Sequence, residues 1–217
     1  MSSRKYPKSG TRSTHLDVDI LPDNIRILIF GEKFNKRIKA KLPETLKILK
    51  FGFWFNEDIN KMPESLKTLV FRGIFDKKIE GKLSKSLRKL ALSMNFDKEI
   101  GKLPETLRIL KFGCCFNEDI EGKVPNSVRR LTFGRDFNRD IEGKLPTSLR
   151  TLKLGSDFNK NIDRLPEELR YLSLGLRFNR EINGKLPKYL VNLEIDGDFD
   201  KNIDNLPKTL KSLDISG

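Results

Sequence analysis

Residues 41–59 read Lys41-Leu42-Pro43-Glu44-Thr45-Leu46-Lys47-Ile48-Leu49-Lys50-Phe51-Gly52-Phe53-Trp54-Phe55-Asn56-Glu57-Asp58-Ile59, and this unit recurs along nearly the whole chain. Its proline marks the period, because successive prolines lie 20 or 21 residues apart and Ser84 fills the one missing place: Pro22, Pro43, Pro63, Pro104, Pro125, Pro146, Pro166, Pro187 and Pro207. A fixed period of this length is the signature of a solenoid. We therefore expect about ten stacked turns of 20–21 residues over residues 20–217.

Within each unit the leucines are spaced for a short strand. Leu46, Leu49 and Phe51 follow a Leu-x-x-Leu-x-Leu pattern, which points these side chains inward and leaves Ile48 and Lys50 outward. Pro43 to Leu46 is predicted to form one helical turn, with proline at its first position. The expected fold is a leucine-rich-repeat-like solenoid, with one curved parallel β-sheet and short 3-10 or helical turns opposite. Some units are longer by a glycine that must lie in a surface bend: Gly81, Gly122, Gly143 and Gly184.

A column of phenylalanines closes each unit, and we expect it to form the core: Phe34, Phe55, Phe75, Phe96, Phe116, Phe137, Phe158, Phe178 and Phe199. The next residue is Asn in most units and Asp at positions 76, 97 and 200. Because an aspartate side chain only accepts hydrogen bonds, the shared role is predicted to be acceptance of backbone N–H groups within the turn, not a ladder of amide donors between coils.

The unit, in which a Phe-Asn-x-x-Ile stretch such as residues 55–59 is followed in most units by Leu-Pro and a Leu-x-x-Leu strand, resembles the FNIP-repeat proteins of social amoebae and giant viruses. The resemblance covers roughly residues 20–217 and implies a leucine-rich-repeat-like fold. Some members carry an F-box, ahead of the repeats, that recruits ubiquitin-ligase machinery. Residues 1–19 are too short and polar for one. The proline that closes the family motif is also replaced in every unit, by Arg37, Asp58, Lys78, Glu99, Asp119, Asp140, Asn161, Glu181 and Asn202.

Composition argues against catalysis and against cofactors. The only histidine is His15, and the two cysteines, Cys114 and Cys115, are adjacent, so they are expected to be reduced thiols. These residues supply neither a usual zinc site nor a Ser-His-Asp triad, and we predict no enzyme activity, metal or cofactor. No apolar run approaches the roughly 18 residues of a membrane span, and no signal peptide is evident. An intracellular, cytoplasmic protein without membrane insertion is expected, in the host cytoplasm if the source is viral.

Basic residues recur at two positions of the unit, within a chain of net charge +13. The first follows the strand's first leucine: Arg26, Lys47, Lys67, Arg88, Arg108, Arg129, Arg150, Arg170 and Lys211. The second precedes Leu-Pro: Lys41, Lys61, Lys82, Lys102, Lys123, Lys144, Arg164 and Lys185. Stacked like charges must reach solvent or a counter-ion, and the acids at 44, 64, 105 and 167 lie three residues before a base. Solvated ladders and polyanion binding, through Lys47, Lys67, Arg88, Arg108, Arg129, Arg150 and Arg170, both remain open.

Two further surfaces depart from the repeat. Early turns place Ile27, Ile29, Ile48 and Val70 on the outward sheet face, either as a partner-binding surface or because β-branched residues suit strands. We call the column of core phenylalanines the spine. The two residues before each spine phenylalanine are charged or polar in turns one, six and seven. Turns two to five instead carry Phe53, Trp54, Ile74, Met94, Cys114 and Cys115 there. These six are predicted to form an exposed apolar strip that binds a partner; the alternative is that the turns fold inward and enlarge the core.

The sequence therefore predicts a non-enzymatic scaffold that presents a solenoid surface to a protein partner. The alternative is a binder of RNA, DNA or acidic surfaces through the basic ladders. Residues 1–19 are expected to be a disordered basic arm, and Leu16, Val18 and Ile20 a partial cap. Because the last unit closes on a strand, end-to-end self-association is also expected to be possible.

Overall fold

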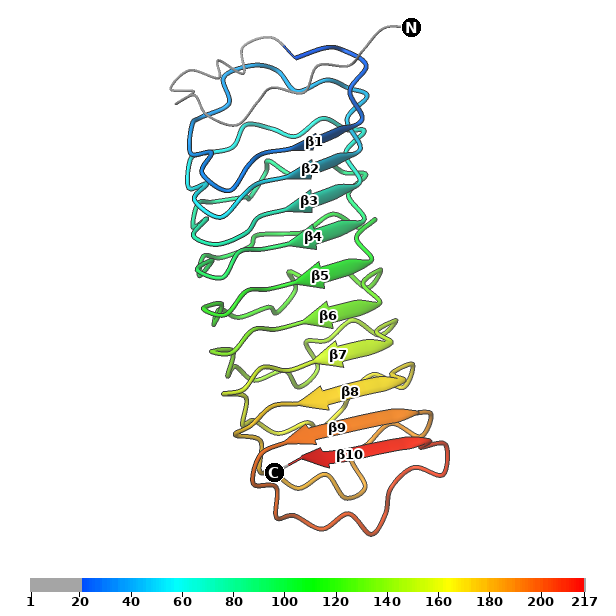
Figure 1. Ribbon diagram of the computed structural model, residues 1–217. Coiled ribbons are helices and arrows are strands. Elements are labelled where there is room, and N and C mark those ends of the chain that lie inside the picture. Colours follow the sequence, from blue (N-terminus) through cyan, green and yellow to red (C-terminus); the bar gives the residue numbers. More distant parts are fainter. Residues whose placement is uncertain (1–20, 217) are drawn as a thin grey trace, which may run out of the picture.

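The computed structural model describes residues 21–216 as one stack of ten strands. The strands are β1 (Ile27–Ile29), β2 (Ile48–Lys50), β3 (Thr68–Val70), β4 (Lys89–Ala91), β5 (Ile109–Lys111), β6 (Arg130–Thr132), β7 (Thr151–Lys153), β8 (Tyr171–Leu174), β9 (Asn192–Asp196) and β10 (Ser212–Ser216). They form a single sheet in which sequence neighbours pair in parallel. Figure 1 shows the strands along one side of the stack, with the connecting loops behind. The predicted solenoid is confirmed, and we number each turn by its strand.

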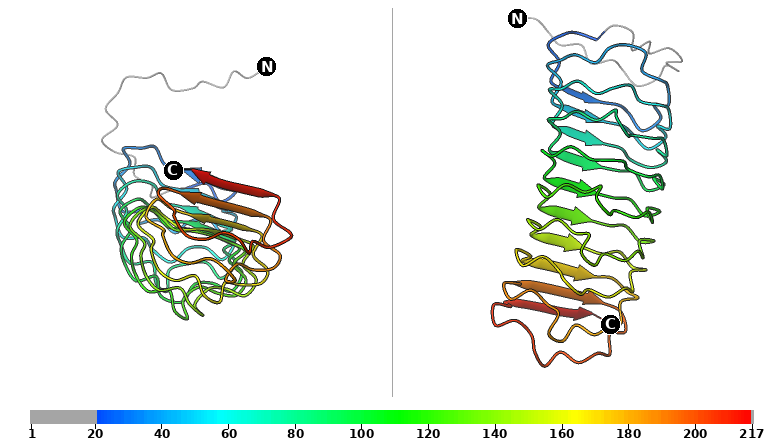
Figure 2. Two further views of the ribbon diagram at one scale, coloured as in Figure 1. Left: turned by 90° about the horizontal axis from the view of Figure 1, so that it is seen from below. Right: turned by 180° about the vertical axis from the view of Figure 1, so that it is seen from behind.

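The register of the sheet places equivalent residues side by side in every turn. Leu49 pairs with Leu28 on one side and Leu69 on the other, and the same leucine column continues to Leu213. These leucines are buried in turns two to nine, while the residues on either side of them face outward. The connections wind around the remaining sides of the stack, as the end view in Figure 2 shows. Each turn therefore offers the same few outward positions to solvent.

Phenylalanine rings fill the interior opposite the leucines, as predicted. Successive spine rings lie nearly parallel with centroids about one turn apart, such as Phe137 and Phe158 at 6.2 Å. Several turns add a second ring from the end of the strand, and the Phe133 centroid lies 3.7 Å from that of Phe137. From Phe55 to Phe178 the spine is almost fully buried. Aromatic packing of this extent supplies much of the apolar burial that stabilises each turn.

The segment before each strand is a hydrogen-bonded β-turn, so the predicted 3-10 or helical turn does not form. The Leu46 N–H donates to the Pro43 carbonyl at 3.0 Å, and no helix occurs between residues 21 and 216. One such bond closes a four-residue β-turn, and a Ser or Thr inside it ties the turn to the coil before. The Thr45 hydroxyl, for example, donates to the Ile25 carbonyl at 2.8 Å. The hydroxyl bond to the neighbouring coil holds the turn in place without additional hydrogen bonds of a helix.

The Asn/Asp column accepts hydrogen bonds as predicted, but between coils rather than within a turn. The Asn138 side-chain oxygen accepts the Asn159 backbone N–H at 3.0 Å, and the Asn138 N–H donates to the Asn117 oxygen at 3.0 Å. Aspartate performs the same role, since Asp76 accepts the Asp97 N–H at 3.1 Å. Only the side-chain oxygen is needed for this bond, so Asn and Asp are interchangeable at this position.

The longer units take up their extra residue in a tight bend, as expected. In the bend after β6 the Lys144 N–H donates to the Ile141 carbonyl at 3.1 Å, and Gly143 adopts a φ of 70°. A positive φ at the third residue of a hydrogen-bonded turn favours glycine, because a β-carbon would be strained there. The predicted arm (residues 1–19) and its cap residues lie outside the described part of the chain.

Candidate functional site

The apolar strip, Phe53, Trp54, Ile74, Met94, Cys114 and Cys115, runs beside the ends of strands β2 to β5. Trp54 is 53% exposed, Met94 50% and Phe53 37%, whereas Ile74 and the two cysteines are half-buried. The exposure predicted by comparing turns is therefore confirmed for the three largest side chains, and the alternative of inward folding is wrong for them. Binding of a partner at the strip stays a prediction. Sequence reasoning passed over Leu176, which occupies the same position in turn eight and is 60% exposed.

A backbone ladder holds the strip in line. The Ile74 N–H donates to the Phe53 carbonyl at 3.0 Å, and the Cys115 N–H donates to the Met94 carbonyl at 2.9 Å. The Phe53 and Trp54 rings make an edge contact with centroids 5.4 Å apart. Because the same ladder continues through the polar turns six and seven, the strip differs from those turns in side chains and not in backbone path.

A groove of about 610 Å³ separates the strip from the outward face of the sheet. Phe53, Met94 and Cys114 of the strip line it together with Lys111 and Thr132 of strands β5 and β6. Glu32 and Arg72, which pair with each other at 3.0 Å, also line it. Its floor contains three glycines: Gly73, Gly113 and Gly134. A β-carbon on Gly113 would lie 1.7 Å from the Ser93 carbonyl oxygen. Close stacking of the coils therefore requires glycine here, and the missing side chain leaves the groove open.

Nine bases lie at outward positions within or directly before strands β2 to β6, and we call this surface the basic sheet face. It combines the predicted ladder with outward strand residues, and it comprises Lys47, Lys50, Lys67, Arg88, Lys89, Arg108, Lys111, Arg129 and Arg130. No acidic residue occupies an outward position between them. Among residues 21–216, none of the nine forms an ion pair. The sequence predicted the ladder but not its union with Lys50, Lys89 and Lys111, although strand alternation could have revealed it.

The acids three residues before these bases do not neutralise them. Glu44 contacts Lys41 at 3.7 Å instead, and the Glu64 carboxylate accepts the Lys85 backbone N–H at 3.0 Å. Arg170, beyond the face, pairs with Glu168 at 3.7 Å rather than with the Glu167 carboxylate. The predicted pairs do not form, because Glu44 and Glu64 have other partners and Arg170 pairs with Glu168, so that expectation is wrong.

Beyond Arg150, the outward charges of turns seven to nine have partners within the protein. The Tyr171 hydroxyl donates to Glu194, and the Lys153 ammonium lies 4.7 Å from the Tyr171 ring centroid and 4.0 Å from Glu194. Burial and the Glu194 hydrogen bond raise the pKa of Tyr171, while the Tyr171 hydrogen bond raises the pKa of Lys153. Arg170 lies over the Tyr189 ring at 5.0 Å. The unpaired part of the predicted ladder therefore ends with Arg150.

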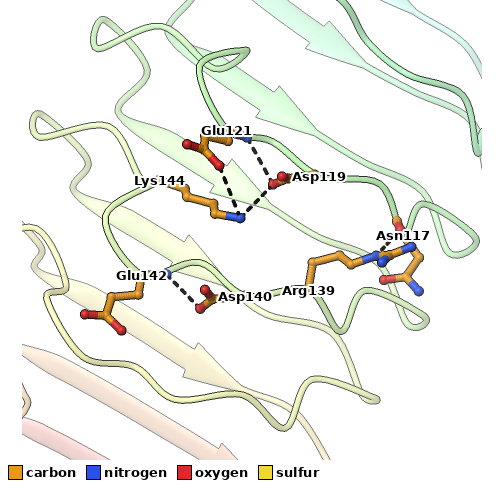
Figure 3. A network of polar contacts seen from close by, with 7 residues as sticks. All are labelled: Asn117, Asp119, Glu121, Arg139, Asp140, Glu142 and Lys144. Carbon is orange, nitrogen blue, oxygen red and sulfur yellow. Dashed lines mark hydrogen bonds and ion pairs between the residues drawn. The ribbon is translucent and has the colours of Figure 1, made fainter.

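The second predicted basic column, which we call the bend column, lies in the bends before Leu-Pro, and five of its eight bases form ion pairs: Lys41, Lys82, Lys144, Arg164 and Lys185. Figure 3 shows Lys144 pointing between Asp119, at 3.1 Å, and Glu121, at 3.6 Å. The hydrogen bond from Lys144 to Asp119 raises the Lys144 pKa. Burial alone raises the pKa of Asp119, but bonds from Lys144 and from the Glu121 backbone together lower it. The bend column therefore mainly joins neighbouring coils through ion pairs.

The remaining predicted residues have separate positions. Ile27 and Ile29 are exposed on the outward face of β1, while Ile48 and Val70 are half-buried beside the basic residues of β2 and β3. Burial, followed by the charge of Asp136, raises the pKa of the Cys115 thiol, which disfavours the nucleophilic thiolate. Residues 21–216 contain no group of three or more His, Cys, Asp or Glu side chains arranged to hold a metal. The same residues include no helix able to cross a membrane.

Comparison with known proteins agrees with this architecture. The FNIP Repeat family model matches residues 14–54, 116–157, 141–177 and 178–217. The crystal structure of CroV588, described as a novel circular LRR protein structure, is similar with a TM-score of 0.81 and 35% identity over 90% of this chain. This chain covers 34% of that chain's length. No curated protein matches the sequence. With the family model matching well over half of the residues, the chain belongs to the FNIP-repeat family.

Proposed function

We propose that this protein is a non-enzymatic scaffold that binds a protein partner through the apolar strip and the groove beside it. One observation carries the proposal: Phe53 and Trp54 of turn two and Met94 of turn four are exposed, where the equivalent positions of turns one, six and seven are charged or polar. Apolar surface gathered in this way marks contact sites, and tryptophan is often the energetic anchor. Solenoids also use their extended surfaces for binding.

A Trp54→Ser variant tests the proposal. Because the indole is 53% exposed, the free energy of unfolding should change by no more than about 0.5 kcal/mol, whereas capture of the partner should be lost. Capture is measured from the native cell at two salt concentrations with nuclease controls. The captured protein is then identified and its binding repeated with purified components.

Leu176→Ser is the matched control, because it removes an exposed apolar side chain from the same column outside the strip. It should leave capture unchanged. A stability loss of about 3 kcal/mol in Trp54→Ser would identify a core role for the indole instead. Equal capture by both variants and the parent would contradict binding at the strip.

A polyanion binder is the second candidate, and the nine unpaired bases of the basic sheet face favour it. Contacts to phosphate make affinity fall steeply with salt, so capture that is lost with nuclease and with salt would support this function. No aromatic ring lies among the nine bases to stack a nucleobase. The protein-binding proposal is therefore preferred. End-to-end self-association stays a prediction for measurement of mass in solution.

A further inference from the structure

The apolar groove and the basic sheet face occupy the same turns. The strip belongs to turns two to five, and the nine unpaired bases belong to turns two to six. Lys111 joins the two surfaces directly, since it is an exposed base of the sheet face and also lines the groove together with Met94. A partner that fills the groove must therefore approach the bases as well.

The bases of the sheet face have no counter-charge in the folded protein. Backbone bonds keep them one turn apart: the Arg108 N–H donates to the Arg88 carbonyl at 2.8 Å, and the Arg129 N–H donates to the Arg108 carbonyl at 2.9 Å. The only polar side-chain bond among the nine runs from Arg108 to the Ser127 backbone carbonyl at 3.0 Å. Like charges held at strand spacing, about 4.8 Å, repel one another, and an acidic ligand would relieve that repulsion.

The surface changes at both ends of this region. Strand β1 presents Ile27 and Ile29, and beyond Arg150 the outward charges of turns seven to nine are paired through Lys153, Tyr171 and Glu194. The bases without an ion pair that lie beside the groove therefore belong to turns two to six. A ligand that matches this region carries carboxylates on one side and apolar side chains on the other.

We propose that the partner contributes an extended acidic segment, whose carboxylates lie over the basic sheet face while its apolar side chains enter the groove that Met94 and Lys111 help to line. This inference rests on the proposed function and adds the chemical class of the partner. A nucleic acid would use the basic side chains, but it has no alkyl side chains for the groove, and its aromatic bases carry polar groups at their edges. Electrostatic complementarity speeds the encounter, and apolar burial slows dissociation.

Synthetic peptides provide the test. The probe is a fluorescent peptide in which Glu alternates with Leu and Phe, and its comparison peptides replace either every Glu with Gln or every Leu and Phe with Ser. The acidic apolar peptide should bind the full chain, and each replacement should weaken its Kd by roughly tenfold or more. Raising the salt should weaken binding of the acidic apolar peptide only in part, because ionic contacts are screened and apolar contacts are not.

Two sets of charge reversals distinguish an effect of the sheet-face positions from an effect of the net charge of the protein. The variant Lys89→Glu, Lys111→Glu and Arg130→Glu should weaken binding of the acidic apolar peptide by roughly tenfold or more. The matched variant Lys61→Glu, Lys78→Glu and Lys102→Glu changes the net charge equally at exposed bases away from the sheet, and it should stay within about twofold of the parent. Thermal melts confirm that both variants fold. Equal losses in the two sets would reduce the effect to net charge and overturn the proposal.

Two other outcomes would also overturn it. If an oligouridylate of matched charge binds more tightly than the peptide and depends on the same three sheet-face bases, the face is a nucleic-acid site. If no peptide binds while Trp54→Ser still abolishes capture of a purified protein partner, the scaffold function stands and the acidic class of partner is wrong. If no peptide binds and Trp54→Ser captures the partner as well as the parent does, the proposed function is wrong as well.

Discussion

The basic sheet face and the bend column are built from the same residue types at the same period, yet only the bend column forms ion pairs. Five of the eight bend-column bases reach a carboxylate, whereas none of the nine sheet-face bases does. The Lys144 side chain is only 19% exposed because it folds against Asp119. Arg129 and Arg130, from the same turn, lie open to solvent.

The cause is the placement of acids relative to the coil stack. Asp58, Asp119 and Asp163 lie in the bend one turn before Lys82, Lys144 and Lys185, so stacking brings each pair together. The outward strand positions of turns two to six hold only apolar, small or basic residues. Repetition alone therefore does not make a charged column structural. Whether a column is free to bind depends on the residues that the neighbouring turn places against it.

Both surfaces depend on tight stacking of the coils. Gly134→Ala should disturb this stacking and cause the largest loss of stability. The added β-carbon would lie 1.9 Å from the Gly113 carbonyl oxygen, so the coils must separate. We expect a loss of about 3 kcal/mol in a denaturant melt. Gly143→Ala is the control: its β-carbon meets nothing within 4 Å, and the positive φ alone should cost about 1 kcal/mol. Similar losses in the two variants would contradict the close-contact explanation.

The side-chain ladder that spaces the two surfaces is expected to contribute next. Asn138→Leu removes the oxygen that accepts the Asn159 N–H, and an unpaired donor should lower the free energy of unfolding by about 1–3 kcal/mol. Asn138→Asp keeps the acceptor and should change it by only a few tenths of a kcal/mol, within the usual range for tolerated surface changes. Denaturant melts with equal midpoints for the two variants would count against the acceptor role.

Neutralising one base from each surface should give effects of opposite sign. Lys144→Met removes the counter-ion of Asp119 and is expected to lower Tm. Lys111→Met removes an unpaired charge from among like charges and is expected to leave Tm unchanged or slightly raised. Calorimetry at low salt measures the difference in Tm between the two variants, and added salt should make this difference smaller. A larger decrease for Lys111→Met than for Lys144→Met would break the distinction between the two surfaces.

The smallest expected effect is the pH dependence of the Lys144 pair. The folded pKa of Asp119 lies below its usual 3.8, so its contribution to stability is complete above that value and is lost as pH falls through the lower folded value. The Tm difference between the parent and Lys144→Met should therefore be present at neutral pH and shrink below about pH 4. A difference that persists after Asp119 is protonated would assign it to packing of the lysine stem.

Sequence patterns predicted most of the scaffold, because one residue type serves one role in every turn. Leu49, Phe55 and Asn56 recur at their positions, and the structure confirms their sheet, spine and acceptor roles. Two local predictions were wrong for one reason. Assigning a helical turn to Pro43–Leu46 and a within-turn role to Asn56 considered one unit alone, whereas the bonds that form join neighbouring coils.

The candidate site was predicted in part. Comparing turns was enough to predict the exposed positions of Phe53, Trp54 and Met94, because the backbone path repeats while the residue changes. The groove was not predictable in this way, because Gly73, Gly113 and Gly134 belong to different units of the sequence and come to line one groove only when the coils stack.

By itself the sequence determined the number of turns, the inward residues and the identity of the family, because periodic spacing fixes which side chains a stacked coil must bury. Only the tertiary structure decided which bases are paired and where an apolar groove meets open positive charge. The physical reason is that ion pairs and grooves depend on contacts between residues about one turn apart. Those contacts follow from the stacking of coils and from side-chain reach, which the repeat period does not specify.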